Sequence, residues 1–376
     1  MRIDLPGGPY TLREPVAWGR PQAPARERIA YAAAHVVADP LADNTPGSPA
    51  ALDWDATLRY RHHLWSYGLR VADAMDTAQR NMGLDWAATR ELIGRSAREA
   101  ATLGDPALLL SCGAGTDHRP EAATLQAVTD AYLEQIETVR ASGAGVIVMA
   151  SRQLARVAGG PEDYHRVYGR LLAAADRPVI LHWLGEMFDP QLAGYWGSHD
   201  VEAATESFLA LVREHAARVE GVKVSLLDEE HEVRLRAALP AGVRLYTGDD
   251  FNYPSLIRTG SHALLGIFDA IAPAASAALA ALDAGDTDAY EKILAPTVPL
   301  SRKIFETPTF GYKTGIVFLA WLNGHQDAFT MVNGAQSARS LPHLVEVFRL
   351  ADRAGLLSDP DLAVRRMGAL LAVNGR

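Results

Sequence analysis

The chain contains only four lysines, Lys223, Lys292, Lys303 and Lys313, against 32 arginines. Because arginine supplies most of the positive surface charge here, each lysine is a candidate for chemistry that arginine cannot perform. Lys292 and Lys303 have polar neighbours in helical patterns and are expected to be solvated, whereas Lys313 lies near an expected helix start and its role stays open. Lys223 stands apart, since it lies in a short β-type run that ends before a turn-like Leu-Asp pair.

A lysine at the end of a buried strand is suited to imine chemistry. Partial loss of water disfavours its charged form, lowers its pKa and exposes the neutral amine that attacks a carbonyl group. The resulting iminium draws electrons and stabilises a carbanion on the next carbon. The alternative is a lysine that extends from a strand end into solvent, and the pattern alone does not exclude it.

Eight short apolar or small-residue runs alternate with helical patterns, as expected for parallel strands buried on both faces. The predicted strands are residues 28–37, 70–75, 107–113, 145–151, 178–184, 221–225, 243–248 and 262–268. Their number predicts a (β/α)8 TIM barrel, a fold that gathers its catalytic groups at the C-terminal ends of the strands. An open doubly wound sheet is the alternative, because periodicity does not distinguish a closed sheet from an open one.

The predicted organisation has three parts. Residues 1–27 form an N-terminal arm without periodicity, residues 28–285 the barrel, and residues 286–376 a helical extension packed on the barrel. The clearest helices are predicted at residues 122–141, 201–219, 287–305 and 342–374.

Composition excludes several classes of partner. With a formal net charge of -9 and a pI near 5.7, attraction to nucleic acid or to anionic membranes is not expected. The N-terminus lacks the apolar run of a secretory signal, and the single cysteine, Cys112, fits a reducing compartment. We therefore expect a cytoplasmic protein with neither nucleic-acid nor membrane partners.

Three segments in the second half of the chain resemble the dihydrodipicolinate synthase and N-acetylneuraminate lyase superfamily of class I aldolases. Gly221-Val222-Lys223 is similar to the family's Gly-Ile-Lys segment, which carries the Schiff-base lysine on the sixth strand. Residues 246–250 (Tyr-Thr-Gly-Asp-Asp) resemble the seventh-strand segment, and residues 259–266 the Gly-rich eighth-strand region. The resemblance covers about residues 28–320 and implies a TIM barrel, an imine on Lys223 and a homodimer or homotetramer.

The substrate pocket departs from the family pattern. His182 stands where the family has a proton-relaying tyrosine, a role that an imidazole can also perform. The carboxylate-binding turn is replaced by residues 75–79, in which Asp76 and Thr77 are suited to substrate hydroxyl groups. Met187 replaces an arginine of the synthases, and residues 150–153 lack their tyrosine pair. These departures argue against dihydrodipicolinate synthesis.

Plainer readings of these residues remain open. His182 could be a core histidine bonded to the backbone, Asp76 a cap of a loop or helix, and Asp249 with Asp250 a helix cap. A metal site built from scattered residues is a further alternative, although no His-x-His strand or other compact motif supports it. Its candidate ligands are Asp73, Asp76, His35, His118, His182 and Glu186.

The sequence therefore predicts a class I aldolase or lyase that acts on a hydroxylated keto compound derived from a sugar and needs neither cofactor nor metal. Lys223 forms the imine and His182 transfers protons. Substrate contacts are assigned to Asp76, Thr77, Ser225, Gly248 and Asp249. The alternatives are a metal-dependent aldolase or isomerase on the same fold and a non-catalytic sugar-binding barrel, because a fold does not determine a function.

Overall fold

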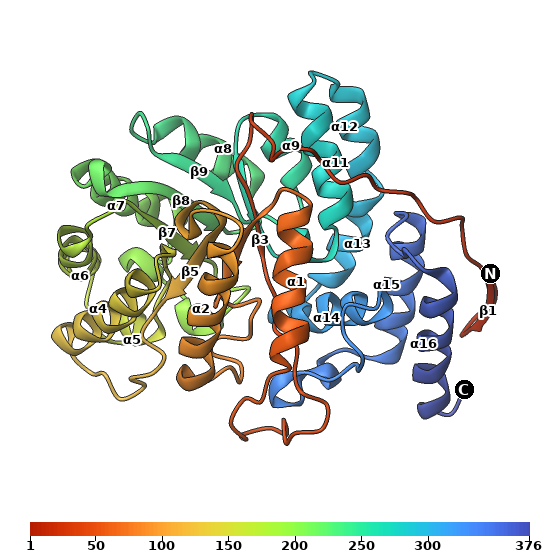
Figure 1. Ribbon diagram of the computed structural model, residues 1–376. Helices are drawn as coiled ribbons and strands as arrows, with labels where there is room; N and C mark the ends of the chain where they lie inside the picture. Colours follow the sequence, from red (N-terminus) through yellow and green to blue (C-terminus); the bar gives the residue numbers. More distant parts are fainter.

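Eight parallel strands close into a barrel, and the computed structural model describes residues 1–376 (Figure 1). The barrel strands are β3 (Ala30–Ala33), β4 (Arg70–Asp73), β5 (Leu110–Ala114), β6 (Gly145–Val148), β7 (Val179–Leu184), β8 (Val219–Ser225), β9 (Arg244–Thr247) and β10 (His262–Leu265). β10 pairs with β3, so the last strand joins the first. The predicted TIM barrel is confirmed, and the open doubly wound sheet is wrong.

Each of the eight predicted runs overlaps one barrel strand, although the boundaries differ. The run 107–113 begins too early, because Asp105 caps a short helix, α3 (Pro106–Leu109), and β5 begins only at Leu110. β8 begins at Val219, earlier than predicted, and runs in register along β7 as far as Ser225.

Helices surround the barrel (Figure 1). They are α1 (Trp54–Ser66), α2 (Trp86–Ala101), α4 (Leu125–Ala141), α5 (Arg152–Val157), α6 (Pro161–Ala174), α7 (Val201–Glu214), α8 (Glu229–Ala238), α9 (Tyr253–Arg258), α10 (Ile267–Ala270) and α11 (Ala272–Asp283). Several of these helices begin after a capping residue whose side chain accepts a hydrogen bond from the backbone N–H three residues later. This N–H has no partner within the helix itself. Thr124 does so for α4, and the predicted helix 122–141 therefore begins at Leu125.

The C-terminal residues form five helices where the sequence predicted two long ones. They are α12 (Thr287–Leu294), α13 (Thr297–Ile304), α14 (Tyr312–Leu322), α15 (Leu341–Arg353) and α16 (Pro360–Val373). Both predicted long helices are broken: Pro296 separates α12 from α13, and a left-handed Gly355 follows α15. α14 escaped prediction because it has no polar face, and all of its residues are buried.

The first residues of the predicted N-terminal arm are paired strands. They form a hairpin of β1 (Arg2–Leu5) and β2 (Gly8–Thr11), an antiparallel pair. The Tyr10 hydroxyl donates to Asp352 of α15 at 2.7 Å, and the N- and C-terminal segments lie near one another (Figure 1). The division into residues 1–27, 28–285 and 286–376 remains our proposal for the organisation of the chain.

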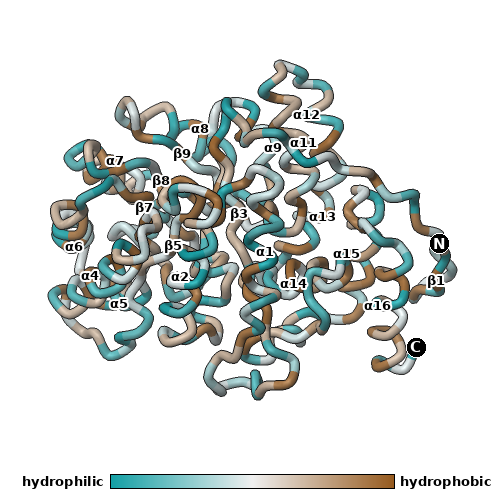
Figure 2. The backbone as a smooth tube through the Cα atoms, viewed as in Figure 1, coloured by the Kyte–Doolittle hydropathy of each residue, from teal (hydrophilic) through white to brown (hydrophobic).

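Two hydrophobic clusters stabilise the barrel. The larger, of 94 buried residues, includes the outward-facing strand residues and the helix faces that cover them. The smaller, of nine residues, includes Tyr31, Ile147, Ile180, Tyr246 and Leu264 and fills the barrel interior. Figure 2 shows hydrophilic stretches (teal) along the outer turns of many helices.

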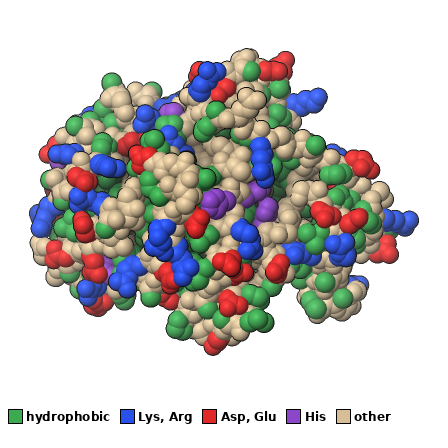
Figure 3. All heavy atoms as spheres, in the orientation of Figure 1, with side chains coloured by type: hydrophobic (Ala, Val, Ile, Leu, Met, Phe, Trp, Pro, Cys, Tyr) green, Lys and Arg blue, Asp and Glu red, His purple; other side chains and the backbone are tan.

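The molecular surface carries charges of both signs. Figure 3 shows acidic and basic side chains interspersed over one face. None of the helices is both long and apolar enough to cross a membrane.

A buried ion pair joins α1 to the end of β4. The guanidinium of Arg61 donates to both carboxylate oxygens of Asp73, at 2.7 and 3.1 Å, and both side chains are fully buried. Asp73 also accepts the Ser96 hydroxyl and the backbone N–H of Ala74. The pair therefore fixes the strand end that leads into the loop containing Asp76.

We expect Arg61→Met to lower the free energy of unfolding by about 3–5 kcal/mol, because Asp73 would keep a buried charge without its counter-ion. Urea unfolding measures this change. Arg234→Met is the control, since Arg234 forms an exposed pair with Glu202 and its loss should cost at most about 1 kcal/mol. Equal losses in the two variants would contradict a special contribution from the buried pair.

Candidate active site

Lys223 lies on β8 with its side chain directed into the barrel. Its sequence neighbours Val222 and Val224 belong to the outer cluster, and side chains alternate between the two faces of a strand. Lys223 lies opposite His182 of β7 and Tyr246 of β9, and its exposure is only 4%. The amine is therefore placed inside the half of the barrel where TIM-barrel enzymes hold their reacting groups.

Gly248, directly after β9, leaves room for this lysine. A Cβ atom at position 248 would lie 3.0 Å from Cε of Lys223 and would overlap the hydroxyl of Ser225. The structure thus gives Gly248 a steric role, while its predicted contact with substrate remains a prediction.

Two carboxyl groups oppose the effect of burial on Lys223. Burial lowers the pKa of the amine; the negative charge of Asp76, and that of Asp250 in its ionised form, raise it, with a net lowering. No hydrogen bond or ion pair holds the amine. Burial raises the pKa of Asp250 to about 8, although a backbone N–H from Ile267 and the charge of Lys223 act against it. Asp250 is therefore largely a neutral acid at neutral pH.

Asp76 remains ionised despite its burial. Burial raises its pKa, but the charges of Lys223 and Lys313, His182 and a hydrogen bond from Tyr312 lower the pKa to about 2. The Tyr312 hydroxyl donates to Oδ2 of Asp76 and lies 2.7 Å from Oγ1 of Thr77. Oδ1 of Asp76 is buried without a partner. The site thus contains one unused carboxylate acceptor.

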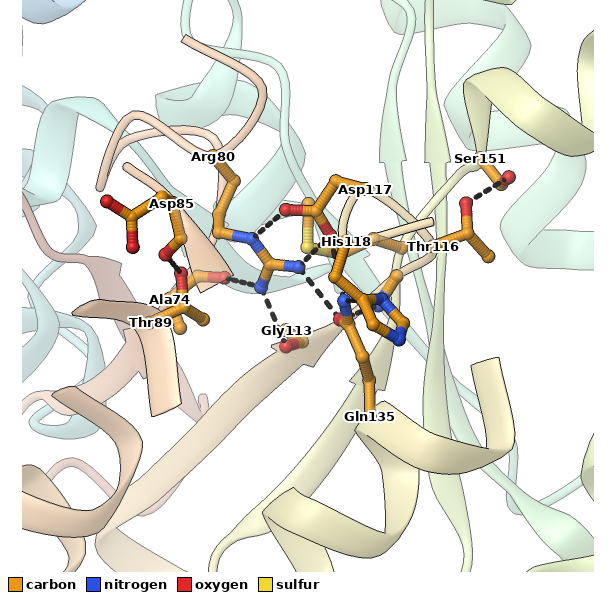
Figure 4. Close-up of polar contacts among 12 residues, drawn as sticks. Ala74, Arg80, Asp85, Thr89, Gly113, Thr116, Asp117, His118, Gln135 and Ser151 are labelled. Atoms are coloured by element: carbon orange, nitrogen blue, oxygen red, sulfur yellow. Dashed lines mark hydrogen bonds and ion pairs between the residues drawn. The ribbon is translucent and has the colours of Figure 1, made fainter. Parts of the chain in front are cut away.

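Arg80 holds the start of the loop that contains Asp76 and Thr77. Its buried guanidinium donates to the carbonyl oxygens of Ala74 and Gly113, at 3.0 and 3.2 Å, and forms an ion pair with Asp117 (Figure 4). Ala74 adopts a left-handed conformation with φ of 53°, which is strained for a residue with a side chain. The Arg80 network therefore supports a backbone turn that the isolated loop would not favour.

His182 faces the same space from β7. Its Nε2 lies 3.3 Å from the Ser225 hydroxyl, and its Nδ1 is buried without a partner. Burial, and then the charge of Lys223, hold its pKa well below 6.5. The imidazole is neutral, and its proposed proton transfer stays a prediction.

Asp249 makes hydrogen bonds mainly within its own loop. Its carboxylate accepts the backbone N–H groups of Phe251 and Asn252 and the side-chain amide of Asn252. These bonds agree with the capping alternative, and the predicted contact of Asp249 with substrate stays a prediction. The neighbouring Asp250 acts electrostatically on Lys223 instead.

Two residues of the site were not identified from the sequence. Lys313 and Tyr312 begin α14, and both side chains are buried. The scarcity of lysine drew attention to Lys313 but did not assign it a role. Tyr312 gave no signal, because a tyrosine after a turn is ordinary and α14 lies far along the chain from the barrel.

Lys313 completes the charged cluster. Its ammonium lies 4.2 Å from the ring centre of Tyr312 and donates to the carbonyl of Phe310 at 3.2 Å. Burial lowers its pKa to about 8, partly offset by Asp76 and Asp189. Lys313 also lines a narrow pocket with Asp76, His182 and Phe188.

Two larger cavities lie elsewhere. One of about 450 Å³ is lined by Tyr31, Arg70 and Arg244 near the starts of the strands, the end where conserved features of this fold usually serve stability. Another, of about 380 Å³, lies outside the barrel beside His63 and His325. Neither cavity is lined by Asp76 or His182, whereas both residues line the narrow pocket, so we place the active site there.

The scattered candidate metal ligands do not come together. Asp73 pairs with Arg61, His35 with Asp269, and His118 with Glu134. No group of three or more His, Cys, Asp or Glu side chains could hold a metal ion. The sequence-based alternative of a site built from these residues therefore has no geometric support.

The fold is shared with solved dihydrodipicolinate synthases. The 4-hydroxy-tetrahydrodipicolinate synthase of Methylacidiphilum fumariolicum SolV is 13% identical, with a TM-score of 0.67 over 92% of this chain and 99% of that one. The Aquifex aeolicus synthase is 13% identical, with a TM-score of 0.66 over 88% and 99%. The chloride-inhibited Acinetobacter baumannii synthase complexed with pyruvate is 15% identical, with a TM-score of 0.66 over 88% and 100%. The predicted resemblance is confirmed at the level of the fold.

A family model described as "Protein of unknown function (DUF993)" matches residues 5–376. No curated protein matches the sequence.

Gly248→Ala tests whether the Lys223 side chain needs the space beside β9. We expect a loss of about 1–3 kcal/mol in the free energy of unfolding, because the added methyl group overpacks a filled interior. Gly368→Ala in α16 is the matched control: nothing lies near its Cβ position, and alanine should stabilise the helix by about 0.5–1 kcal/mol. An unchanged stability of Gly248→Ala would contradict the tight packing.

Proposed function

The chain belongs to the DUF993 family of proteins of unknown function. We propose that it is a Schiff-base-forming class I aldolase or lyase. The observation that supports this proposal most strongly is the position of Lys223, a buried amine without a hydrogen-bond or ion-pair partner beside two carboxyl groups and a neutral imidazole. Such an amine is the nucleophile that imine chemistry requires.

In the proposed reaction, the neutral amine of Lys223 attacks the substrate carbonyl. The carbonyl oxygen takes a proton, for which the neutral acid Asp250 is the candidate donor. A second proton, from the nitrogen of the adduct, lets that oxygen leave as water and gives the iminium. The neutral imidazole of His182 is the candidate base that removes the proton from a β-hydroxyl group. The adjacent carbon–carbon bond then breaks, an aldehyde is released, and the bonding electrons move into the iminium to form an enamine. Protonation and hydrolysis release the ketone and regenerate the amine.

The substrate proposed for this reaction is a hydroxylated keto compound derived from a sugar. The unpartnered Oδ1 of Asp76 is an acceptor for a substrate hydroxyl group, and the hydroxyl groups of Thr77 and Ser225 lie in the same region. Met187 and residues 150–153 still argue against dihydrodipicolinate synthesis. The imine itself replaces any need for a cofactor.

We extend the proposal to assembly and location. The sequence resemblance favours a homodimer or homotetramer that acts on a small molecule, and the single cysteine favours the cytoplasm. Neither nucleic acid nor a membrane is a proposed partner.

Reductive trapping tests the imine directly. We expect incubation with cyanoborohydride and a panel of keto compounds, including pyruvate and dihydroxyacetone, to produce a mass increase on the peptide that contains Lys223. Lys223→Met should give no adduct, and Lys292→Met, at an exposed lysine, should label like the wild type.

The same experiment separates the alternatives. No adduct on Lys223 with any compound, together with turnover that a chelator abolishes, would favour a metal-dependent enzyme. Binding of sugars without adduct or turnover would favour a non-catalytic barrel. Either outcome contradicts the proposal.

A further inference from the structure

Lys313 is a buried cation without an anionic partner. Its exposure is 3%, and one hydrogen bond to a carbonyl oxygen leaves two of the three ammonium protons unused. Neither nearby carboxylate forms an ion pair with Lys313: Asp189 pairs with Arg152 at 2.6 Å, and Asp76 accepts the Tyr312 hydroxyl through Oδ2 while its Oδ1 has no partner. Because an unpaired buried charge is costly, its retention beside a pocket calls for an external partner.

Arg152 adds a second cation at the same pocket. Its Nε donates to Asp189, whereas its two terminal nitrogens have no partner in the protein. A quarter of the side chain is exposed, so the terminal nitrogens can meet a bound molecule. Phe188 and Leu192 form apolar walls between the polar groups.

The start of α14 strengthens the positive potential. α14 begins at Tyr312, has no side-chain cap and is buried along its whole length. The N-terminus of a helix carries a partial positive charge that favours anions. Lys313 and the helix dipole therefore act on the pocket in the same direction.

We propose that Lys313 and Arg152 form a subsite for an anionic group of the substrate, a carboxylate or a phosphate. The inference rests on the proposed imine chemistry at Lys223 and narrows its substrate to an anionic hydroxylated keto compound. Asp76 interacts electrostatically with both Lys223 and Lys313. We therefore place the anionic group of the substrate beside Lys313, on the side of Asp76 that faces away from Lys223. The substrate hydroxyl groups then lie between the anion and the reacting carbonyl.

Matched probe pairs test this subsite. Levulinate and methyl levulinate carry the same ketone with and without a carboxylate, and dihydroxyacetone phosphate and dihydroxyacetone form the corresponding phosphate pair. The rate of cyanoborohydride-dependent labelling of Lys223, measured against probe concentration, gives a half-saturation value for each compound. We expect the half-saturation value of the anionic member of one pair to be at least about tenfold lower than that of its neutral counterpart. A charge-assisted hydrogen bond contributes a binding free energy of this size.

Lys313→Met should remove the preference between the two members of a pair while the neutral probe still labels Lys223, and circular dichroism should show that the variant folds. Lys313→Arg should retain part of the preference, and Lys292→Met all of it. The preference should weaken as the pH rises through about 8, because Lys313 loses its proton there and an uncharged amine no longer attracts the anion.

The outcomes distinguish the two proposals. If Lys223 is labelled equally by both members of each pair in the wild type and in Lys313→Met, the anion subsite is wrong and the imine chemistry stands. If no probe labels Lys223, the proposed function itself fails. The probe pair that shows the preference identifies the anionic group as a carboxylate or a phosphate.

Discussion

The burial of the Lys223 amine is the constraint on which the site depends. An ammonium group removed from water must be neutralised or compensated, and this protein does both in part. Asp76 supplies a full negative charge, while Asp250 stays largely protonated and supplies a proton donor. Gly248 gives the lysine its space, and the Arg80 network keeps Asp76 in place. Loss of any one of these features would alter the ionisation or the position of the amine.

The barrel and the place of Lys223 could be predicted because they depend on local sequence. A parallel strand buried on both faces is a continuous apolar run, so eight such runs indicate eight strands. The resemblance assigned Lys223 and His182 to neighbouring strands, and in the structure the alternation of side chains along each strand directs both into the same interior. Their pairing across β7 and β8 follows from the register that adjacent parallel strands adopt.

The rest of the pocket could not be predicted, because it arises from contacts between distant segments. Tyr312 and Lys313 reach the barrel only through the packing of α14, and an apolar helix carries no sequence mark of what its first residues will contact. Asp249 and Asp250 are adjacent in sequence, yet the turn after β9 directs one carboxylate to its own loop and the other towards Lys223. The alternation of side chains between the two faces of a strand ends where β9 ends. The sequence therefore did not show whether Asp249 or Asp250 would face the site.

The ionisation of Lys223 is the most direct test of this account. Selective ¹³Cε labelling of lysine gives four signals in this chain, which single-lysine variants assign. A pH titration by NMR should show the Lys223 signal titrating with a pKa below the ordinary lysine value of 10.5 and moving on addition of a keto compound that forms the imine. A Lys223 signal that titrates at or above 10.5 and does not respond to any keto compound would contradict the account.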